Sequence, residues 1–491
     1  MSIDPSTPVI VGVAQHTQRP DDLTQALEPV ALMELAVRTA ADDAGNAALL
    51  SKLDIIGVVQ GAWKYTNPAR LIADRDGARG AQSSLSANGG NTPQSYLNHF
   101  ARRIASGEIS GAALCGAETI WSRRRLRREG IDQPNTEQVD VEPDERFGDN
   151  VTMGTEFERS RGMEMPINFY PLFDSAIRAS RGESIDEHRT RLANLWQGFN
   201  EQAVANDHAW SRTAMTADEI REPGKGNRMV GFPYTKAMNS NWDLDQGAAV
   251  LMCSAQLAED LNIPRDRWVF PWAGTDAHDT YSVTNRRDLH SSPAITEAGK
   301  ALFTLADKSP DDVAHIDLYS CFPSAVQVGA ASIGFGEDRQ LTQTGGLTFA
   351  GGPLNNYVTH SIAAMVDTLR SDPGTLGLVS ANGGYLTKHA IGLYSTEPSG
   401  KPFGWASPQD VIDQAPQTAS AEEYSGAAEV EAYTVMHNAE GPEVGLCALR
   451  TPDGARTWGQ VTDTGAMAEM ISDEAIGRRG DLSPEGEFAF A

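Results

Sequence analysis

Two glycine-rich turns are the segments of this 491-residue chain best suited to holding a reacting oxygen atom. The first, Asn88-Gly-Gly-Asn91, precedes a predicted helix, and the second, Asn382-Gly-Gly384, follows a predicted strand. Free backbone N–H groups at such turns can donate to a carbonyl oxygen or an oxyanion. Glycine is also required wherever a tight turn takes a positive φ, and that need alone would account for both segments. The pattern leaves both interpretations open.

The cysteines do not suggest thiol chemistry. The four stand at positions 115, 253, 321 and 447, and none is part of a Cys-x-x-Cys pair. This scatter supports neither a disulfide framework nor a metal site, and it indicates a reducing compartment, which we expect to be the cytoplasm. Cys115 lies within an apolar run, as is typical of an inert, buried thiol. We expect no covalently bound cofactor and no metal.

The charge of the chain narrows the range of partners. With 66 acidic and 40 basic residues, the formal net charge is −26. Such a field repels nucleic-acid phosphates and anionic membranes, so neither is an expected partner. No apolar stretch approaches the length of a bilayer span, and the first residues lack the pattern of a secretory signal.

The order of the predicted elements indicates a duplicated α/β core. Strands and helices alternate in the first part of the chain, over residues 8–14, 29–44, 53–59, 94–106 and 111–117. A comparable order recurs over residues 294–305, 315–320, 324–334 and 360–370, followed by two strands around Gly383-Gly384. Alternation of this kind favours sheets covered by helices, with a repeated βαβ half.

The same pattern divides the chain into four parts. We expect a first half over 1–122 and 235–258, a second half over 259–398, and a lid-like polar excursion over 123–234 that lies outside both sheets. Residues 399–491 contain short alternating runs separated by turn residues, which predict a small all-β domain with an acidic tail.

Four segments, in this order, resemble motifs of the thiolase superfamily, particularly the sterol-carrier-protein type: Val9 to Ala14, Asp243 to Val250, His315 to Ser324 and Gly345 to Leu354. The resemblance implies a layered α/β/α/β/α core built from the two halves. It also implies that residues 399–491 form an OB-like domain of the kind that accompanies several thiolase relatives.

The resemblance further implies a site for an acyl-coenzyme A thioester, as substrate or ligand. Thiolases attack the thioester with a cysteine at a helix start, helped by a histidine and a second cysteine. Here Asn91, Gly352 and Ser380 align with these three groups, so thiolysis and Claisen condensation are expected to be absent or weak. Cys321 aligns with a residue that packs rather than reacts in the family. The expected substrate-binding residues are Asn91, Gly351, Gly352, Ser380, Asn382 and Gly383.

Three further polar residues are the predicted catalytic groups: Tyr319, Tyr357 and His360. Some thiolase relatives without the cysteine are aldolases with tyrosines near these motif positions. A tyrosine can hydrogen-bond a carbonyl and, with a lowered pKa, accept a proton. Each tyrosine is also a plausible packing residue. An acyltransferase, a retro-aldolase acting on a β-hydroxyacyl-CoA, and a non-catalytic interaction protein therefore remain as alternatives. The acyl group, any role in lipid metabolism and the oligomeric state are open.

An arginine run over residues 123–128 allows two interpretations. These side chains could pair with the phosphates of coenzyme A, which in thiolases lie on the loop side. Alternatively, the run is a solvated helix face neutralised by nearby acidic residues, which is the commoner role of a charge run. The acidic residues in question are Glu129, Glu142, Asp144 and Glu145.

Overall fold

The computed structural model describes residues 3–133 and 135–491. Its first sheet has the strand order β1-β8-β4-β2-β3-β5. The central strands are apolar and fully buried, as expected for strands covered on both faces. The sheet comprises β1 (Pro8–Thr17), β8 (Asp245–Ser254), β4 (Gly111–Thr119), β2 (Ile55–Val58), β3 (Gln82–Ser86) and β5 (Glu145–Phe147).

The second sheet repeats the central pairing of the first. Its order is β10-β11-β12-β9-β13, and its strands are β10 (His315–Asp317), β11 (Gly377–Gly383), β12 (Lys388–Ser395), β9 (Phe270–His278) and β13 (Gly404–Ala406). From β9 to β12, β11 and β10 the pairs are antiparallel, antiparallel and parallel. The pairs from β1 to β8, β4 and β2 follow the same sequence. The predicted duplication is therefore present in the sheet topology.

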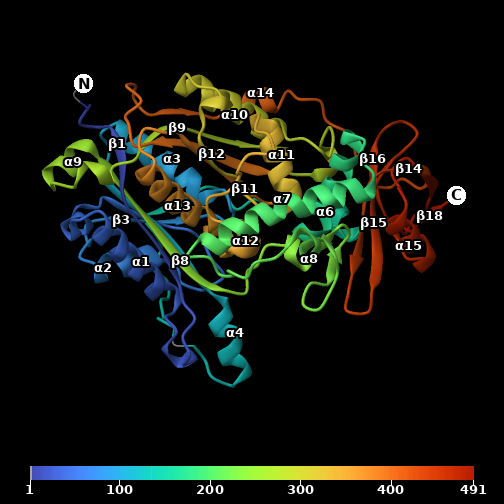
Figure 1. The fold of residues 1–491 in the computed structure, drawn as a ribbon, viewed down its shortest axis with the longest axis horizontal. Helices are drawn as coiled ribbons and strands as arrows, with labels where there is room; N and C mark the ends of the chain where they lie inside the picture. Colours follow the sequence, from blue (N-terminus) through green and yellow to red (C-terminus); the bar gives the residue numbers. More distant parts are fainter. Residues whose placement is uncertain (1–2, 134) are drawn as a thin grey trace.

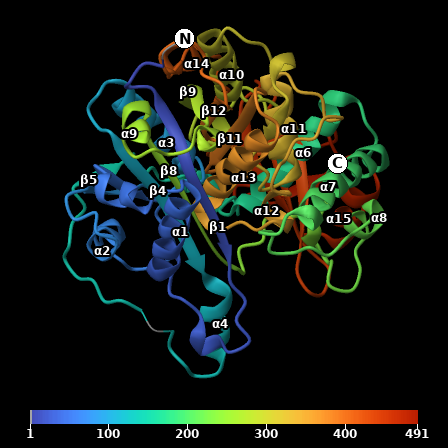
Figure 2. The same cartoon turned by 60° about the vertical axis from the view of Figure 1, so that its left-hand side comes forward.

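Helices complete the layers (Figures 1 and 2). Between the sheets lie α3 (Thr92–Ala105) and α13 (Tyr357–Ser371), which contact strands of both. On the outer face of the first sheet lie α1 (Pro29–Asp43) and α2 (Pro68–Arg75), whereas α10 (Pro293–Ala306), with α11 (Pro323–Ile333) beside it, covers the second sheet. A short helix, α9 (Ala255–Asp260), follows β8. The predicted α/β/α/β/α core is confirmed.

The excursion between β4 and β8 is mainly helical. It contains α4 (Ile120–Arg128), α5 (Glu156–Ser160), α6 (Pro166–Arg181), α7 (Ile185–Ala205) and α8 (Ala217–Arg221). The expectation that it would lie outside both sheets is wrong at β5, which pairs with β3. In addition, β6 (Met229–Gly231) pairs with β7 (Tyr234–Thr235) and with the C-terminal sheet. Strands this short leave no alternating pattern in the sequence.

The C-terminal sheet has the order β16-β15-β14-β17-β18. Its strands, all antiparallel, are β14 (Gly426–His437), β15 (Pro442–Arg450), β16 (Arg456–Val461), β17 (Arg479–Leu482) and β18 (Phe488–Phe490). The domain is not purely β, because α15 (Thr464–Ser472) packs on β15. The predicted boundary at residue 399 also differs from the structure, since β13 belongs to the second sheet and is followed by α14 (Gln409–Ile412).

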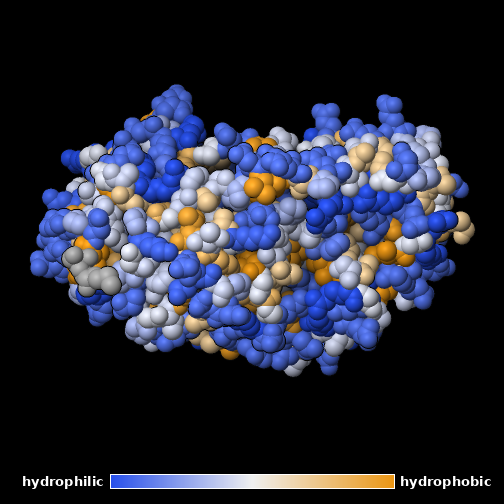
Figure 3. Space-filling view, turned by 90° about the horizontal axis from the view of Figure 1, so that it is seen from above, coloured by the Kyte–Doolittle hydropathy of each residue, from blue (hydrophilic) through white to orange (hydrophobic). Residues whose placement is uncertain are grey.

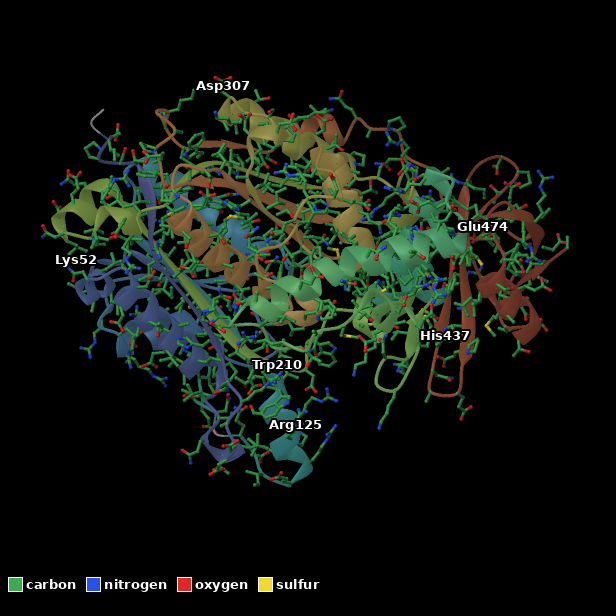
Figure 4. All side chains as sticks on the ribbon, viewed as in Figure 1. Lys52, Arg125, Trp210, Asp307, His437 and Glu474 are labelled. Carbon is green, nitrogen blue, oxygen red and sulfur yellow. The ribbon has the colours of Figure 1, made fainter. Side chains whose placement is uncertain are left out.

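Two buried arginines, Arg178 and Arg456, attach the C-terminal sheet to the rest of the chain. Arg178 of α6 is 1 % exposed, and it donates to Glu474 at 2.9 Å and to the hydroxyl of Tyr433 at 3.1 Å. Figure 4 shows Glu474 at this junction. Arg456 donates to the backbone carbonyls of Thr284 and Arg286. Because a buried charge is costly without its partners, these contacts hold the domain in one position.

The surface agrees with the acidic composition. The face in Figure 3 is mostly hydrophilic, with apolar residues in small groups. Over residues 3–133 and 135–491, no helix combines the length and the apolar character needed to cross a bilayer.

Candidate functional site

A cavity of about 710 Å³ lies between the start of α3, the turn after β11 and the start of α6, and we call it the larger cavity. The core side of its wall is formed by Asn88–Gly90, Tyr319 and Asn382–Gly384, whereas the excursion contributes mainly apolar side chains, including Met165, Ile167 and Tyr170. The two glycine-rich turns singled out in the sequence thus meet at one cavity.

The first turn of α3 approaches β11 too closely for any side chain. A Cβ atom added to Gly90 would lie 2.3 Å from the Tyr319 Oη and 2.5 Å from the carbonyl oxygen of Asn382. The N–H groups of Gly90 and Asn91 donate to no acceptor in the described part of the chain. A free backbone donor, the Gly90 N–H, therefore lies where the larger cavity meets the positive end of α3.

Tyr319 is the predicted catalytic residue that reaches the larger cavity. Its backbone N–H donates to the Ser380 Oγ at 3.0 Å, so Ser380 positions Tyr319 rather than lining the larger cavity. Burial, and then the neighbouring Cys321 and Tyr357, raise the pKa of Tyr319 well above its usual value. The phenol is thus neutral and suited to donate a hydrogen bond rather than to accept a proton.

The other two predicted catalytic residues lie in the first turn of α13 and do not line the larger cavity. The hydroxyl groups of Tyr357 and Thr344 are 2.6 Å apart, and the Tyr357 ring meets that of Tyr319 edge-on. The Nδ1 of His360 lies 3.1 Å from the Gln15 Oε1, and burial lowers the pKa of His360 to about 3. This separation from the cavity could not be predicted from the sequence, because the position of a residue on a helix does not show what covers it.

The predicted substrate-binding residues divide in the same way. Gly352, Asn382 and Gly383 line the larger cavity. The Oδ1 of Asn382 is buried without a hydrogen-bond partner, while its Nδ2 donates to the Tyr170 Oη at 2.9 Å. Gly351 instead packs against the Gln246 side chain. An unsatisfied buried acceptor on a cavity wall indicates a missing donor.

Cys321 packs in the hydrophobic core, as expected, and it also lines the larger cavity, two residues before α11. Burial raises the pKa of this thiol to about 12, and the Asn382 Nδ2 lies 3.9 Å from its Sγ. The remaining cysteines are fully buried in β4, β8 and β15. The cavity thus contains a thiol, but not a thiolate.

A second cavity of about 440 Å³ adjoins the first and shares Val151 and Lys388 with it. Asn91 lines this second cavity, and its Oδ1 has no hydrogen-bond partner. Lys388 was not identified from the sequence. Its position at the start of a strand, just after the second glycine-rich turn, was the available signal.

The arginine run lies near an aromatic residue of the larger cavity. Trp242 lines the cavity and is 52 % exposed, and the Arg124 guanidinium lies 5.7 Å from the centre of its ring. In Figure 4, Arg125 projects from α4 near Trp210. Asp243 pairs with both arginines, at 3.5 Å and 3.6 Å.

The acidic residues expected to neutralise α4 do not do so. Glu142 pairs with Arg146, Glu145 pairs with His99 and Arg103, and Asp144 accepts from Ser83. The reason is the pairing of β5 with β3, which carries this acidic segment to the edge of the first sheet. Within residues 3–133 and 135–491, Asp243 is the carboxylate partner of α4.

Comparison with known proteins adds independent information. A family model described as the thiolase-like protein type 1 additional C-terminal domain matches residues 408–487. The crystal structure of a monomeric SCP2-thiolase-like protein type 1 from Mycobacterium smegmatis is 30% identical, covers 100% of both chains and has a TM-score of 0.85.

More distant relatives agree in fold. An acetyl-CoA acetyltransferase from Methanothermobacter thermautotrophicus is 26% identical over 203 residues. The match covers 38% of this chain and 51% of the acetyltransferase, which is about half of its length. The Ltp2-ChsH2(DUF35) aldolase, at 16% identity, has a TM-score of 0.58 and covers 80% of this chain and 99% of its own. At that identity the likeness concerns the fold alone.

Proposed function

Because the chain belongs to the thiolase superfamily, as an SCP2-thiolase-like protein of type 1, we propose that it binds an acyl-coenzyme A thioester in the larger cavity. The observation that carries the proposal is the meeting of the free Gly90 amide with Tyr319 and Asn382. The Gly90 amide and the phenol donate to a thioester carbonyl oxygen, while the Asn382 Oδ1 accepts from an amide N–H of the ligand.

The proposed binding does not lead to thiolase chemistry. A thiolase nucleophile must be a thiolate, and the start of α3 offers Asn91 instead. The raised pKa of Tyr319 likewise argues against a tyrosine base, and hence against the retro-aldol reaction. The site therefore holds and polarises a thioester without the groups that would cleave a carbon–carbon bond.

The arginines of α4 suit the phosphates of the same ligand. In a chain of net charge −26, Arg127 and Arg128 form no ion pair with any described carboxylate, and Arg124 lies beside Trp242 of the cavity wall. We assign coenzyme A's phosphates to this helix, because guanidinium groups bind phosphate oxygens in pairs.

Isothermal titration calorimetry with coenzyme A and acetyl-CoA tests the proposal. We expect binding of both ligands and no cleavage of acetoacetyl-CoA when free coenzyme A is added. A chain that serves only as an interaction protein would show no heat with either ligand. Efficient cleavage of acetoacetyl-CoA would refute the claim that thiolase chemistry is absent.

A second candidate function is acyl transfer through Cys321, because its thiol lies on the cavity wall at a helix start. This function requires the bound ligand to lower the raised thiol pKa. Mass spectrometry after incubation with acetyl-CoA would then detect an added acetyl group in the parent protein but not in Cys321→Ala. An unmodified parent protein would exclude this candidate.

A further inference from the structure

The two cavities meet at Lys388. This residue begins β12, and its Cα pairs with Gly383 of β11 on one side and His278 of β9 on the other. Its Nζ donates to the backbone carbonyl of Asn88 at 2.5 Å. A Cβ atom added to Gly89 would lie 2.7 Å from the same nitrogen. The ammonium group is therefore held against the turn that precedes α3.

Lys388 is a cation without a counter-ion. In this acidic chain it forms no ion pair with a described carboxylate, and burial is what lowers its pKa. An ammonium group has three N–H donors, of which the Asn88 carbonyl uses one. A partly desolvated cation with free donors is stabilised by a bound anion.

The wall of the second cavity adds to this charge. Arg102 lies 3.9 Å over the Trp405 ring and also lacks a carboxylate partner among the described residues. Asp276, on the same wall, accepts from three neutral donors, on Ser95, Asn98 and Trp405, so its oxygen atoms are already hydrogen-bonded within the chain. The other carboxylate is that of Asp149, which is exposed.

The histidines of this wall have partners of their own. His99 lies 3.3 Å from Glu145, the His278 Nδ1 lies 3.1 Å from the Asp279 carbonyl, and His389 lies 3.4 Å from the Asp279 carboxylate. Lys388 is thus the cation that faces both cavities, and its ammonium group has N–H donors that no described acceptor uses.

We propose that Lys388 selects acyl groups that end in a carboxylate. With the thioester at Gly90 in the larger cavity, the acyl chain passes Lys388 and its terminal carboxylate accepts from the Nζ at the entrance to the second cavity. The inference rests on the proposed function and narrows it to thioesters of dicarboxylic acids. An uncharged acyl chain of the same length would leave the half-buried ammonium group without an anion.

Calorimetry with matched ligands tests this selection on the full-length chain. The pairs are glutaryl-CoA against pentanoyl-CoA and adipoyl-CoA against hexanoyl-CoA, with coenzyme A as the reference. In at least one pair we expect the dicarboxylic thioester to bind about tenfold more tightly, the usual gain from a charged hydrogen bond. Lys388→Gln, which keeps a donor for the Asn88 carbonyl, should abolish that preference.

Lys52→Met is the matched control, because Lys52 is an exposed lysine that lines neither cavity; Figure 4 shows it at the left-hand side of the molecule. This variant should keep the preference. Equal affinities within both pairs in the parent protein would overturn the inference, as would a preference that survives Lys388→Gln. Should that variant not fold, Lys388→Met takes its place under the same criterion. Failure to bind even coenzyme A would instead overturn the proposed function, and the inference with it.

Discussion

The two central helices, α3 and α13, occupy equivalent places in the duplicated core, but their first turns have different surroundings. Each follows a Gly-Gly turn, at Gly89-Gly90 and at Gly351-Gly352. At α3 the N–H groups of Gly90 and Asn91 donate to no described acceptor, and Gly90 lines the larger cavity. At α13 Gly352 lines the same cavity, but its N–H donates to the Asn241 carbonyl, and the side chains of Tyr357 and His360 are buried behind it. Equivalent helix starts can therefore be open for a ligand or closed by packing.

The cause of the difference is the length of one connection. Residues 120–244 join β4 to β8, whereas the equivalent strands β11 and β12 are joined by residues 384–387. The long connection supplies Met165, Ile167, Tyr170 and Trp242 to the wall of the larger cavity. Duplication produced a symmetric core, and this insertion made one end of it a site.

The substitution with the largest expected effect tests whether a ligand must reach the backbone at the start of α3. Gly90→Ala places a Cβ against Tyr319 and the Asn382 carbonyl, where there is no room. Relief of this clash displaces Tyr319 and the turn before α3, so the donors no longer converge on one oxygen atom. Loss of two or three hydrogen bonds should lower the affinity for acetyl-CoA by about a hundredfold. Calorimetry measures the change.

Gly198→Ala in α7 is the control for this substitution. No atom lies within 4 Å of the added Cβ, and a helical alanine is favoured over glycine. This variant should bind as the parent protein does and be slightly more stable. Equal affinities for the two variants would show that the α3 end does not contact the ligand.

The second prediction concerns the closed end of α13. The buried His360 has its pKa lowered to about 3, by burial first and then by His208 and His16. Between that value and about 6.5 the unfolded chain binds a proton that the folded chain does not, so stability falls as the pH falls. From pH 7 to pH 5 this residue should cost about 2 kcal/mol of unfolding free energy.

Urea unfolding at the two pH values measures that loss, and His360→Gln provides the reference. The variant lacks the titrating group but keeps a side chain that can bond to Gln15. Its stability should therefore decrease less than that of the parent protein over the same pH interval. Parallel decreases would mean that His360 titrates normally and that the α13 end is not closed.

Sequence patterns predicted the core because its strands and helices are long and buried. The continuous apolar runs of β1 and β8 are typical of strands that are covered on both faces, and the apolar residues of α1 recur at helical spacing. The three-residue strands β5 and β13 were missed, since strands at a sheet edge need no such pattern.

The site was predicted in part, for a different reason. The glycine-rich turns and Tyr319 were found because motif positions identify backbone that must approach closely. Cys321 and Lys388 were not assigned to the site, because a cavity wall depends on which side chains the excursion leaves uncovered. Tyr357 and His360 share the helix start expected of site residues, yet tertiary packing covers them.

The third prediction concerns the open end, at the start of α3. Tyr319→Phe removes the hydroxyl that lies beside Gly90 while the backbone contact to Ser380 remains. Loss of one neutral hydrogen bond to the thioester should weaken binding of acetyl-CoA by about fivefold to tenfold. Calorimetry beside the parent protein measures this, and an unchanged affinity would place the carbonyl oxygen away from Tyr319.

The smallest effect is expected for Tyr357→Phe, the same chemical change at the closed end. Its hydroxyl contacts Thr344, whose Oγ1 still accepts from the Gly346 N–H and donates to Asp317 after the substitution. The Asp317 Oδ1 loses a long contact of 3.5 Å to this hydroxyl, but the Oδ2 of the same carboxylate keeps its donors from Thr342, Gln343 and Thr344. The cost should therefore be about 1 kcal/mol of stability, with unchanged affinity for acetyl-CoA. Thermal unfolding and calorimetry on one sample separate the two quantities. If Tyr357→Phe weakened binding as much as Tyr319→Phe, the two helix starts would act as one site, and the distinction between an open and a closed end would fail.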